Sequence, residues 1–201
     1  METKKIQIIQ KTLELFQIYG IKSVSMDDIS SQMAMSKKTL YLHFNDKKEL
    51  VSEVIDYNFI RIKEIAERTF IKEENAIDQI LALIKFMTEI NEKHSHTMVF
   101  DLQKYFPEEH QKLRKRRGKI LLDFHIYNIQ KGIEQGLYRK DMNVEMVPKI
   151  ILVLSEIIVD NDVVTFANIC HPDFIKEMLI YHLHGVVNEK GHKYLNKKTT
   201  K

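Results

Sequence analysis

Hydrophobic residues recur along most of this chain at intervals of three and four, the spacing of one face of an α-helix. The first stretch has this spacing at Ile6, Ile9, Leu13 and Phe16. Gly20 follows where a helix over residues 3–19 would end, and glycine is a common residue just past a helix. The chain also has only six Gly and three Pro among 201 residues. We therefore predict an all-α fold.

The same pattern places further helices along the chain. We expect a long helix from residue 47 to about residue 70, and later ones over residues 76–93, 99–106, 107–135, 144–160 and from Pro172 onward. The apolar stripe of the long helix consists of Val51, Val54, Ile55, Phe59, Ile62 and Ile65. Residues 188–201 are polar and rich in lysine, so we expect this end to fray.

Two helix starts follow each other closely within residues 24–50. Ser25, with Asp28 three positions later, fits a capping box, in which each side chain bonds to the other residue's backbone N–H. Ser36 is placed to begin a second helix, and only residues 34–36 separate the two. A sharp turn between two short helices predicts a helix-turn-helix.

The second of these helices has one dry face and one polar face. Leu40 and Phe44 are four residues apart, so they share the face that packs on Ile29 and Met33 of the helix before it. The opposite face carries Lys38, Thr39, Tyr41 and Leu42. Such a front suits a DNA major groove, because cations and hydroxyls bind phosphates while other side chains reach base edges.

These residues resemble the DNA-binding domain of TetR-type (TetR/AcrR) transcriptional regulators. The resemblance covers about the first quarter of the chain and rests on the run SKKTLYLHF from Ser36, with Lys47 and Leu50 after it and Met26-Asp27-Asp28-Ile29 before it. The turn around Gly136-Leu137-Tyr138-Arg139 also resembles the family. Ala34 stands where the family commonly has glycine; a left-handed backbone there would cost about 1 kcal/mol relative to glycine.

The resemblance implies an N-terminal three-helix DNA-binding domain over residues 1–46 and a C-terminal helical effector-binding and dimerisation domain over residues 47–201. The long helix at about 47–70 would connect them. The expected function is sequence-specific binding to a palindromic operator, usually as a repressor that a small-molecule effector releases. A homodimer would place two recognition helices roughly 34–36 Å apart, or a multiple of that distance.

We expect nine residues to contact DNA. Lys47 would lie at the first position of the long helix, after the cap Asp46, where backbone N–H groups and the helix dipole favour a phosphate. The predicted phosphate contacts are Ser25, Ser36, Tyr41, His43 and Lys47. The predicted base contacts are Lys37, Lys38, Thr39 and Leu42, the last against a thymine methyl group.

By resemblance, an effector pocket lies among the middle helices. Its expected residues are Phe59, Ile62, Phe86, Phe100, Tyr105, Phe124, His125 and Tyr127, although each would equally suit a helical core. The helix over residues 144–160 is apolar on nearly all sides and so needs cover from a second subunit. The expected dimer interface is Ile151, Leu154, Ile158, Ile175, Met178, Leu179 and His182.

Composition limits the alternatives. The formal net charge is only +3, so DNA binding must come from a local patch. The basic run over residues 112–119 is better interpreted as a solvated helix face, paired with Glu108, Glu109 or a partner subunit, than as a second nucleic-acid site. With one cysteine, Cys170, and no signal peptide or long apolar segment, we expect a cytoplasmic protein without membrane association.

The sequence shows no motif for catalysis, a cofactor or a metal. His94 with His96, and His182 with His184, are two residues apart, which on a helix points their rings to different sides. Acidic residues are scattered over helix faces, so no catalytic pair stands out. We expect no enzyme activity and no cofactor. A helical protein-interaction adaptor and a small helical-bundle enzyme, neither binding DNA, remain the alternatives.

Overall fold

The computed structural model describes residues 2–93, 96–157 and 172–199. Within these ranges the chain is helical, and its only β pairing is an isolated bridge between Tyr138 and Val187. The helices are α1 (Glu2–Tyr19), α2 (Met26–Gln32), α3 (Lys37–Tyr41), α4 (Lys47–Ile71), α5 (Ala76–Lys93), α6 (His96–Tyr105), α7 (Pro107–Glu134), α8 (Val147–Ile157), α10 (Pro172–Val186) and α11 (Glu189–Thr199). This confirms the all-α prediction.

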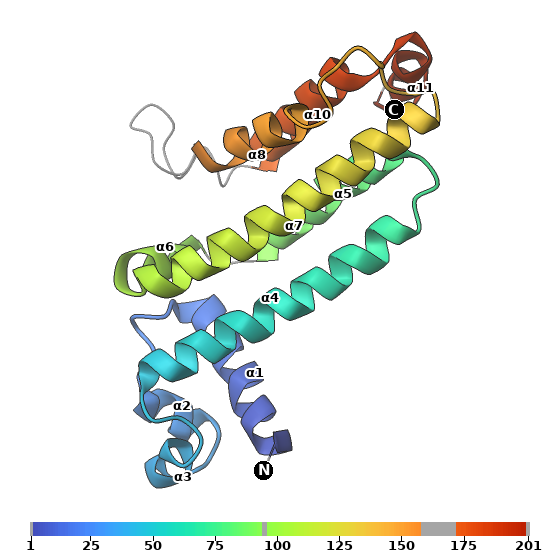
Figure 1. Cartoon of the computed structure of the whole chain (residues 1–201). Helices are drawn as coiled ribbons and strands as arrows, with labels where there is room; N and C mark the ends of the chain where they lie inside the picture. The colour runs from blue at the N-terminus through green and yellow to red at the C-terminus, as the bar shows by residue number, and fades with distance from the viewer. Residues whose placement is uncertain (1, 94–95, 158–171, 200–201) are drawn as a thin grey trace. The chain divides into compact units, whose positions relative to one another are not determined.

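Figure 1 shows the helices with their labels. The chain divides into two compact units. Unit 1 comprises Met1–Ile65 and Lys93–Lys115, and unit 2 comprises Ala66–Glu92 and Arg116–Lys201. The long helices α4 and α7 each contribute to both units. The predicted boundary at residues 46 and 47, between a DNA-binding domain and an effector-binding domain, is a division by function and not by packing. It stays a prediction.

The core of unit 1 joins the helix-turn-helix to its supporting helices. Leu40 of α3 and Phe44 just after it are almost completely buried with Ile29 of α2, and Met33 packs against them. This confirms the joint core predicted from the four-residue spacings. Helix α1 contacts both α2 and α6, so α2 and α3 rest on a base built from elsewhere in the unit.

The core of unit 2 contains a buried polar network around Tyr138. The Tyr138 hydroxyl donates to Asn128 Oδ1 at 2.9 Å, and Asn128 Nδ2 donates to the Ala76 carbonyl at 2.8 Å. The tyrosine ring lies against Gly132, where an added Cβ would be 2.2 Å from Tyr138 Cδ2. Glycine is needed at this position because the ring occupies the space that a side chain would fill.

The prediction that residues 188–201 fray is wrong for residues 189–199, and residues 200–201 lie outside the described residues. Helix α11 forms there, with Gly191 and Leu195 buried on its inner side. The Tyr194 hydroxyl donates to Asp78 Oδ2 at 2.5 Å, and Asn188 Oδ1 accepts from the Gly191 N–H at 3.0 Å. The segment has few apolar residues, but they share one face and dock on unit 2, which supplies the stability that composition did not indicate.

Two helix boundaries differ from those predicted. Helix α6 begins at His96 and not near residue 99. Helix α8 begins at Val147 because Asn143 Oδ1 accepts from the Met146 N–H at 3.1 Å, which makes the preceding residues a turn. The predicted end of this helix, residues 158–160, lies outside the described residues. No helix in the described part of the chain is long and apolar enough to cross a membrane.

Candidate nucleic-acid interface

Helix α2 begins with the predicted capping box. Ser25 Oγ accepts from the Asp28 N–H at 3.2 Å, while Asp28 Oδ2 accepts from the Ser25 N–H at 2.8 Å and from its hydroxyl at 2.6 Å. These hydrogen bonds from Ser25 lower the pKa of Asp28, because they stabilise the carboxylate. The capping box fixes the start of α2, the helix that supports α3.

The turn between α2 and α3 is a Schellman motif closed by an alanine. The Ala34 N–H donates to the Ser31 carbonyl and the Met35 N–H donates to the Ser30 carbonyl, each at 3.0 Å. Ala34 has φ of +48°, and it is the only residue other than glycine with positive φ in the described part of the chain. The left-handed conformation considered for this position is therefore present.

Helix α3 is short and strongly capped. Ser36 Oγ accepts from the Thr39 N–H at 3.1 Å, and the two side-chain oxygens lie 2.9 Å apart. The helix ends at Tyr41, and Leu42 forms its C-cap. With Leu40 buried beneath it, α3 has a single orientation on the rest of the unit.

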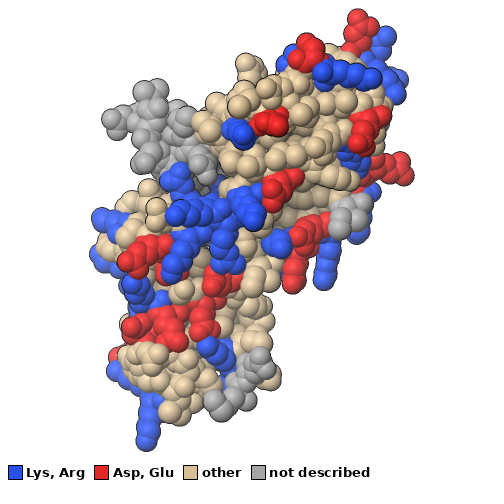
Figure 2. All heavy atoms as spheres, in the orientation of Figure 1, with Lys and Arg blue, Asp and Glu red and all other residues tan. Residues whose placement is uncertain are grey.

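The outer face of α3 projects into solvent. Leu42 is 73% exposed and Tyr41 is 49% exposed, although both are apolar enough to be buried elsewhere. Lys38 is also exposed, and basic side chains project at the lower end of Figure 2, where Figure 1 shows α3. Lys37 instead bonds to Asp27 of α2 at 2.6 Å, and His43 is half-buried beside Phe44. The exposed face of α3 thus presents the ammonium group of Lys38, the phenol of Tyr41 and the isobutyl group of Leu42, which suit a DNA groove.

The Lys47 side chain points toward the segment between α1 and α2. Its Nζ donates to the Ile21 carbonyl at 2.6 Å and lies 3.4 Å from the Lys22 carbonyl. Partial burial lowers the pKa of Lys47, with Asp101 and Asp28 acting in the opposite direction. Its backbone N–H is the first of α4, where helical N–H groups have no intrahelical acceptor. The predicted phosphate contact of Lys47 stays a prediction, and the structure leaves its backbone N–H rather than its ammonium group placed for that contact.

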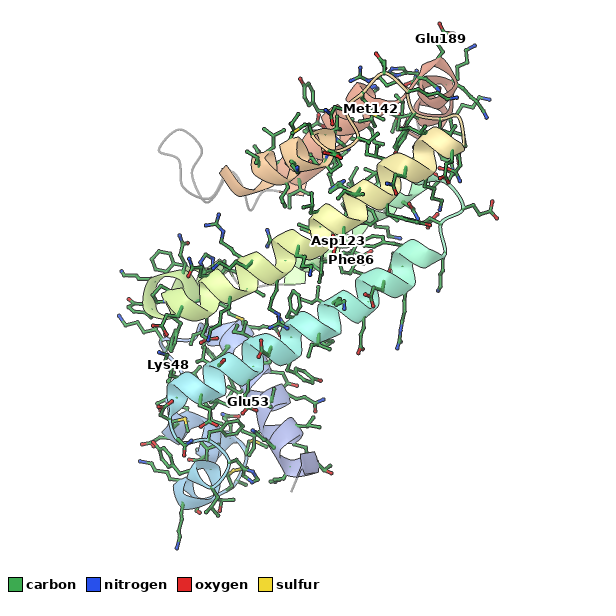
Figure 3. The ribbon with its side chains drawn as sticks, viewed as in Figure 1. Lys48, Glu53, Phe86, Asp123, Met142 and Glu189 are labelled. Atoms are coloured by element: carbon green, nitrogen blue, oxygen red, sulfur yellow. The ribbon has the colours of Figure 1, made fainter. Side chains whose placement is uncertain are left out.

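Helix α4 starts with the predicted cap. Asp46 Oδ1 accepts from the Glu49 N–H at 2.8 Å, and Glu49 Oε2 accepts from the Asn45 N–H at 2.7 Å. The carboxylate of Glu49 thus binds the N–H of the residue before the cap, one residue further back than in a capping box. Lys48, labelled in Figure 3, forms an exposed ion pair with Glu108 at 2.8 Å.

Sequence reasoning missed Asp101 of α6. Its Oδ2 accepts from the Lys22 N–H at 2.8 Å, although the two residues are 79 positions apart. No local pattern marks an aspartate within an amphipathic helix as the partner of a distant turn. Asp101 is only 5% exposed, and this burial of a carboxylate, which marks it as a bonded group, is visible only in the folded chain.

The start of the basic run has an acidic partner, as the sequence interpretation allowed. Lys112 Nζ lies 2.8 Å from Glu109 Oε1, and the other oxygen of Glu109 accepts from Ser52 Oγ at 2.9 Å. Among the described residues, no group of three or more His, Cys, Asp or Glu side chains is placed to bind a metal ion.

Comparison with known proteins identifies the helix-turn-helix. Residues 8–54 match the family model for bacterial regulatory proteins of the tetR family. This range contains α2, α3 and the capped start of α4. The DNA-binding domain of this chain belongs to the TetR family. The chain is accordingly a DNA-binding transcriptional regulator.

Curated relatives in the TetR family are repressors. The chain is 23% identical over 163 residues to the HTH-type transcriptional repressor KstR2 of Mycobacterium tuberculosis, covering 75% of this chain and 77% of that protein. It is 28% identical over 91 residues to IcaR, a negative transcriptional regulator of the biofilm operon icaADBC in Staphylococcus aureus, covering 45% and 49% of the two chains.

Solved TetR-like structures share the fold along most of the chain. A transcriptional regulator from Cytophaga hutchinsonii aligns with a TM-score of 0.72 at 18% identity, covering 92% of this chain and 99% of the other. A regulator from Saccharomonospora viridis in complex with choline aligns with a TM-score of 0.69 at 17% identity, covering 94% and 100%. At these identities the likeness establishes the fold alone.

The residues expected to line a TetR-type effector pocket are divided between the two units. Phe59, Ile62, Phe100 and Tyr105 belong to unit 1, whereas Phe86, Phe124, His125 and Tyr127 belong to unit 2. Of these, Phe86 and His125 are buried, while Phe100, Tyr105 and Tyr127 are exposed. The pocket as a whole stays a prediction.

Unit 2 contains an aromatic cluster that includes two of the predicted pocket residues. The Phe70 ring lies 5.8 Å from that of Phe86 and 4.9 Å from that of Phe124, measured between centroids. Phe86, labelled in Figure 3, belongs to α5. The His125 ring continues the cluster from Phe124 and lies 5.5 Å from the His182 ring, with an interplanar angle of 78°.

The two histidines are buried without full hydrogen bonding. Among the described residues, His125 Nδ1 and His182 Nε2 have no hydrogen-bond partner. Burial lowers the pKa of His125 to about 3, with His182 adding to the effect, and burial lowers the pKa of His182 to about 4. Both imidazoles are therefore neutral at pH 7. The His182 ring lies inside unit 2 and not on an exposed face, where a dimer contact was predicted.

The remaining predicted dimer residues differ in exposure. Ile151 and Leu179 are buried within unit 2, and Ile175 and Met178 pack against its core. Leu154 is 40% exposed, and Ile158 lies outside the described residues. The exposed apolar surface nearby is instead formed by Ile150, Val153 and Leu154 of α8 and Tyr181 of α10.

Proposed function

We propose that this TetR-family regulator is a cytoplasmic repressor that binds a palindromic operator as a homodimer and is released by a small-molecule effector. The outer face of α3 carries the proposal, because Lys38, Tyr41 and Leu42 are exposed while Leu40 anchors the helix. The relatives KstR2 and IcaR are named as a repressor and a negative regulator, which supports repression.

The side chains of α3 divide into two roles at the DNA. Lys38 and Leu42 read bases, since lysine binds guanine edges and an isobutyl group packs on thymine methyl groups. Thr39 and Lys37 adjoin them, and the Lys37–Asp27 ion pair opens when Lys37 meets DNA. Phosphates are held by Ser25, Ser36, Tyr41, His43 and the backbone N–H of Lys47.

The homodimer forms through α8 and α10. Ile150 is 58% exposed, Val153 47% and Tyr181 76%, although α8 is the most apolar helix of the described chain. Large apolar side chains left exposed on such a helix favour a protein contact there. A second copy supplies the required cover and also gives the two-fold symmetry that a palindromic operator needs.

The effector binds within the aromatic cluster of Phe70, Phe86 and Phe124. Beside the three rings lie His125 and His182, each with a ring nitrogen that has no hydrogen-bond partner in the described part of the chain. Ligand sites commonly combine apolar walls with a few polar groups of this kind. Relatives of this fold differ in ligand: one is described as a ketosteroid regulator and another was solved with choline. We therefore assign no effector chemistry from similarity.

Selection from random duplex DNA tests this function. The wild-type protein should enrich a palindrome whose half-site centres are about 10 base pairs apart or a multiple of that spacing. The variant Lys38→Ala/Leu42→Ala should lose the preference at specific positions and keep salt-dependent, sequence-independent binding. Enrichment of no sequence by the wild-type protein would refute the proposal. Enrichment of the same sequence by both proteins would refute the reading role of α3.

A further inference from the structure

The α1–α2 turn, residues 20–23, connects the first helix to the helix-turn-helix. One residue, Val24, separates the turn from Ser25, whose capping box starts α2. Lys47, at the start of α4, holds this turn from one side through the Ile21 and Lys22 carbonyls, at 2.6 and 3.4 Å. The position of the turn therefore determines where α2 begins.

Helix α6 holds the same turn through Asp101. Asp101 Oδ2 accepts from the Lys22 N–H at 2.8 Å, and Asp101 is 5% exposed. Gly20 permits this approach, since an added Cβ would be 2.7 Å from that oxygen and 2.8 Å from Thr97 Cγ2. Gly20 also has φ of +83°, a conformation that favours glycine. The backbone conformation of Gly20 and the absence of a side chain together allow α6 to lie against the turn.

The two contacts fix opposite groups of Lys22. Its N–H is bound by a carboxylate and its carbonyl lies near an ammonium group, and charged partners make stronger hydrogen bonds than neutral ones. The Lys22 side chain takes a separate path, with Nζ donating to the Tyr105 hydroxyl at 3.0 Å on the exposed surface. The backbone and side-chain links can therefore be removed independently.

We propose that Asp101 and Lys47 are positioning residues for DNA binding, which hold the α1–α2 turn and thereby orient α2 and α3. In this role the Lys47 side chain holds the turn within the protein, and only the backbone N–H of Lys47 contacts a DNA phosphate. Asp101 makes α6 part of the support for the reading helices. The DNA measurements below rest on the proposed function, because they need the operator that the wild-type protein selects.

Operator affinity is measured by fluorescence anisotropy with the selected duplex. Asp101→Ala and Lys47→Met should each bind about tenfold more weakly, since each frees a backbone group that a charged partner had held. Asp101→Asn should stay within about twofold of wild type because its Oδ1 still accepts from the Lys22 N–H. Lys22→Ala is the matched control, as it removes the Tyr105 link and keeps the backbone bond. Unchanged affinity in Asp101→Ala would overturn the role of α6.

The salt dependence of binding separates positioning from a phosphate contact at Lys47. Lys47→Met should keep the wild-type slope of log affinity against log salt, whereas loss of a phosphate contact lowers that slope by about 0.9. A slope lowered in Lys47→Met would assign its ammonium group to a phosphate and overturn the positioning role.

Hydrogen exchange tests the turn without DNA. In Asp101→Ala the amide of Lys22 should exchange at least about tenfold faster, while amides in the middle of α1 keep their wild-type rates because the unit stays folded. Equal exchange at Lys22 in both proteins would refute the proposed contact. If the wild-type protein selects no DNA sequence, the proposed function fails, yet this measurement still decides whether Asp101 holds the turn.

Discussion

Ala34 stores backbone strain at the turn of the helix-turn-helix. Its φ of +48° lies in the left-handed region, where an L side chain crowds the following carbonyl. The strain persists because two Schellman hydrogen bonds and the buried residues on both sides determine the turn. Ala34 is exposed, so its methyl group makes little compensating contact.

Replacing this alanine should stabilise the protein. Ala34→Gly should raise the free energy of unfolding by about 1 kcal/mol, since the gain from relieved strain exceeds the cost of a more flexible unfolded chain. Urea denaturation followed by circular dichroism measures the change. Ala34→Val should act in the opposite direction, because a β-branched residue fits this conformation poorly. Destabilisation by glycine would contradict the strain argument.

The buried histidines should make stability depend on pH. Their folded pKa values, about 3 for His125 and about 4 for His182, lie below the ordinary value of 6.5. The unfolded chain therefore binds more protons between these values, so the contribution is complete above pH 6.5 and is lost as pH falls toward 4. Stability should decrease by about 2–4 kcal/mol from pH 7 to pH 5.

Urea unfolding at several pH values checks this dependence. His182→Phe removes one of the two groups and should reduce the pH slope. His184→Gln is the control, because this histidine is exposed and its replacement should leave the slope unchanged. A slope equal to wild type in His182→Phe would show that the buried pair does not cause the dependence.

Helix α11 depends on its docking more than on its own sequence. Its mean character is polar, and isolated helices of this length are marginal in water. Leu195 is fully buried, and Asn188 caps the helix while bonding the Gly136 and Tyr138 carbonyls. The helix and the turn after α7 therefore stabilise each other.

Leu195→Ala should lower the free energy of unfolding by about 2–4 kcal/mol, through lost apolar burial and the cavity left behind. Chemical denaturation followed by circular dichroism measures the loss. Lys197→Ala on the exposed side of α11 is the matched control and should change stability by less than about 0.5 kcal/mol. Equal stability of the two variants would mean that the docking contributes little.

At the scale of the whole molecule, the apolar face of α8 should determine the oligomeric state. Leu154→Asp and Ile150→Asp place a charge in the proposed dimer contact, where its desolvation is costly, and should give monomers. Analytical ultracentrifugation distinguishes the two states. Ile18→Asp is the control, because this residue is 66% exposed on α1 and lies outside the proposed interface. Dimers that persist in both α8 variants would refute the interface.

The sequence by itself determined most of the helices and the helix-turn-helix. Caps at Ser25, Ser36 and Asp46 act within three residues, and the four-residue spacing of Leu40 and Phe44 follows from helix geometry. These are local interactions, so the residues that make them are adjacent in the sequence. Ala34 was singled out by the resemblance to the TetR family, which commonly has glycine at this position, and its positive φ agrees with that.

Only the tertiary structure decided which distant groups meet. Asp101 finds the Lys22 N–H across 79 positions, and Lys47 turns its side chain to the Ile21 carbonyl although its helical position suits a phosphate. The His182 ring lies inside unit 2 beside the His125 ring. Its position along the helix was equally compatible with the predicted contact to a second subunit. Such pairings depend on how helices pack, and that packing depends on the whole chain, which a local pattern does not encode.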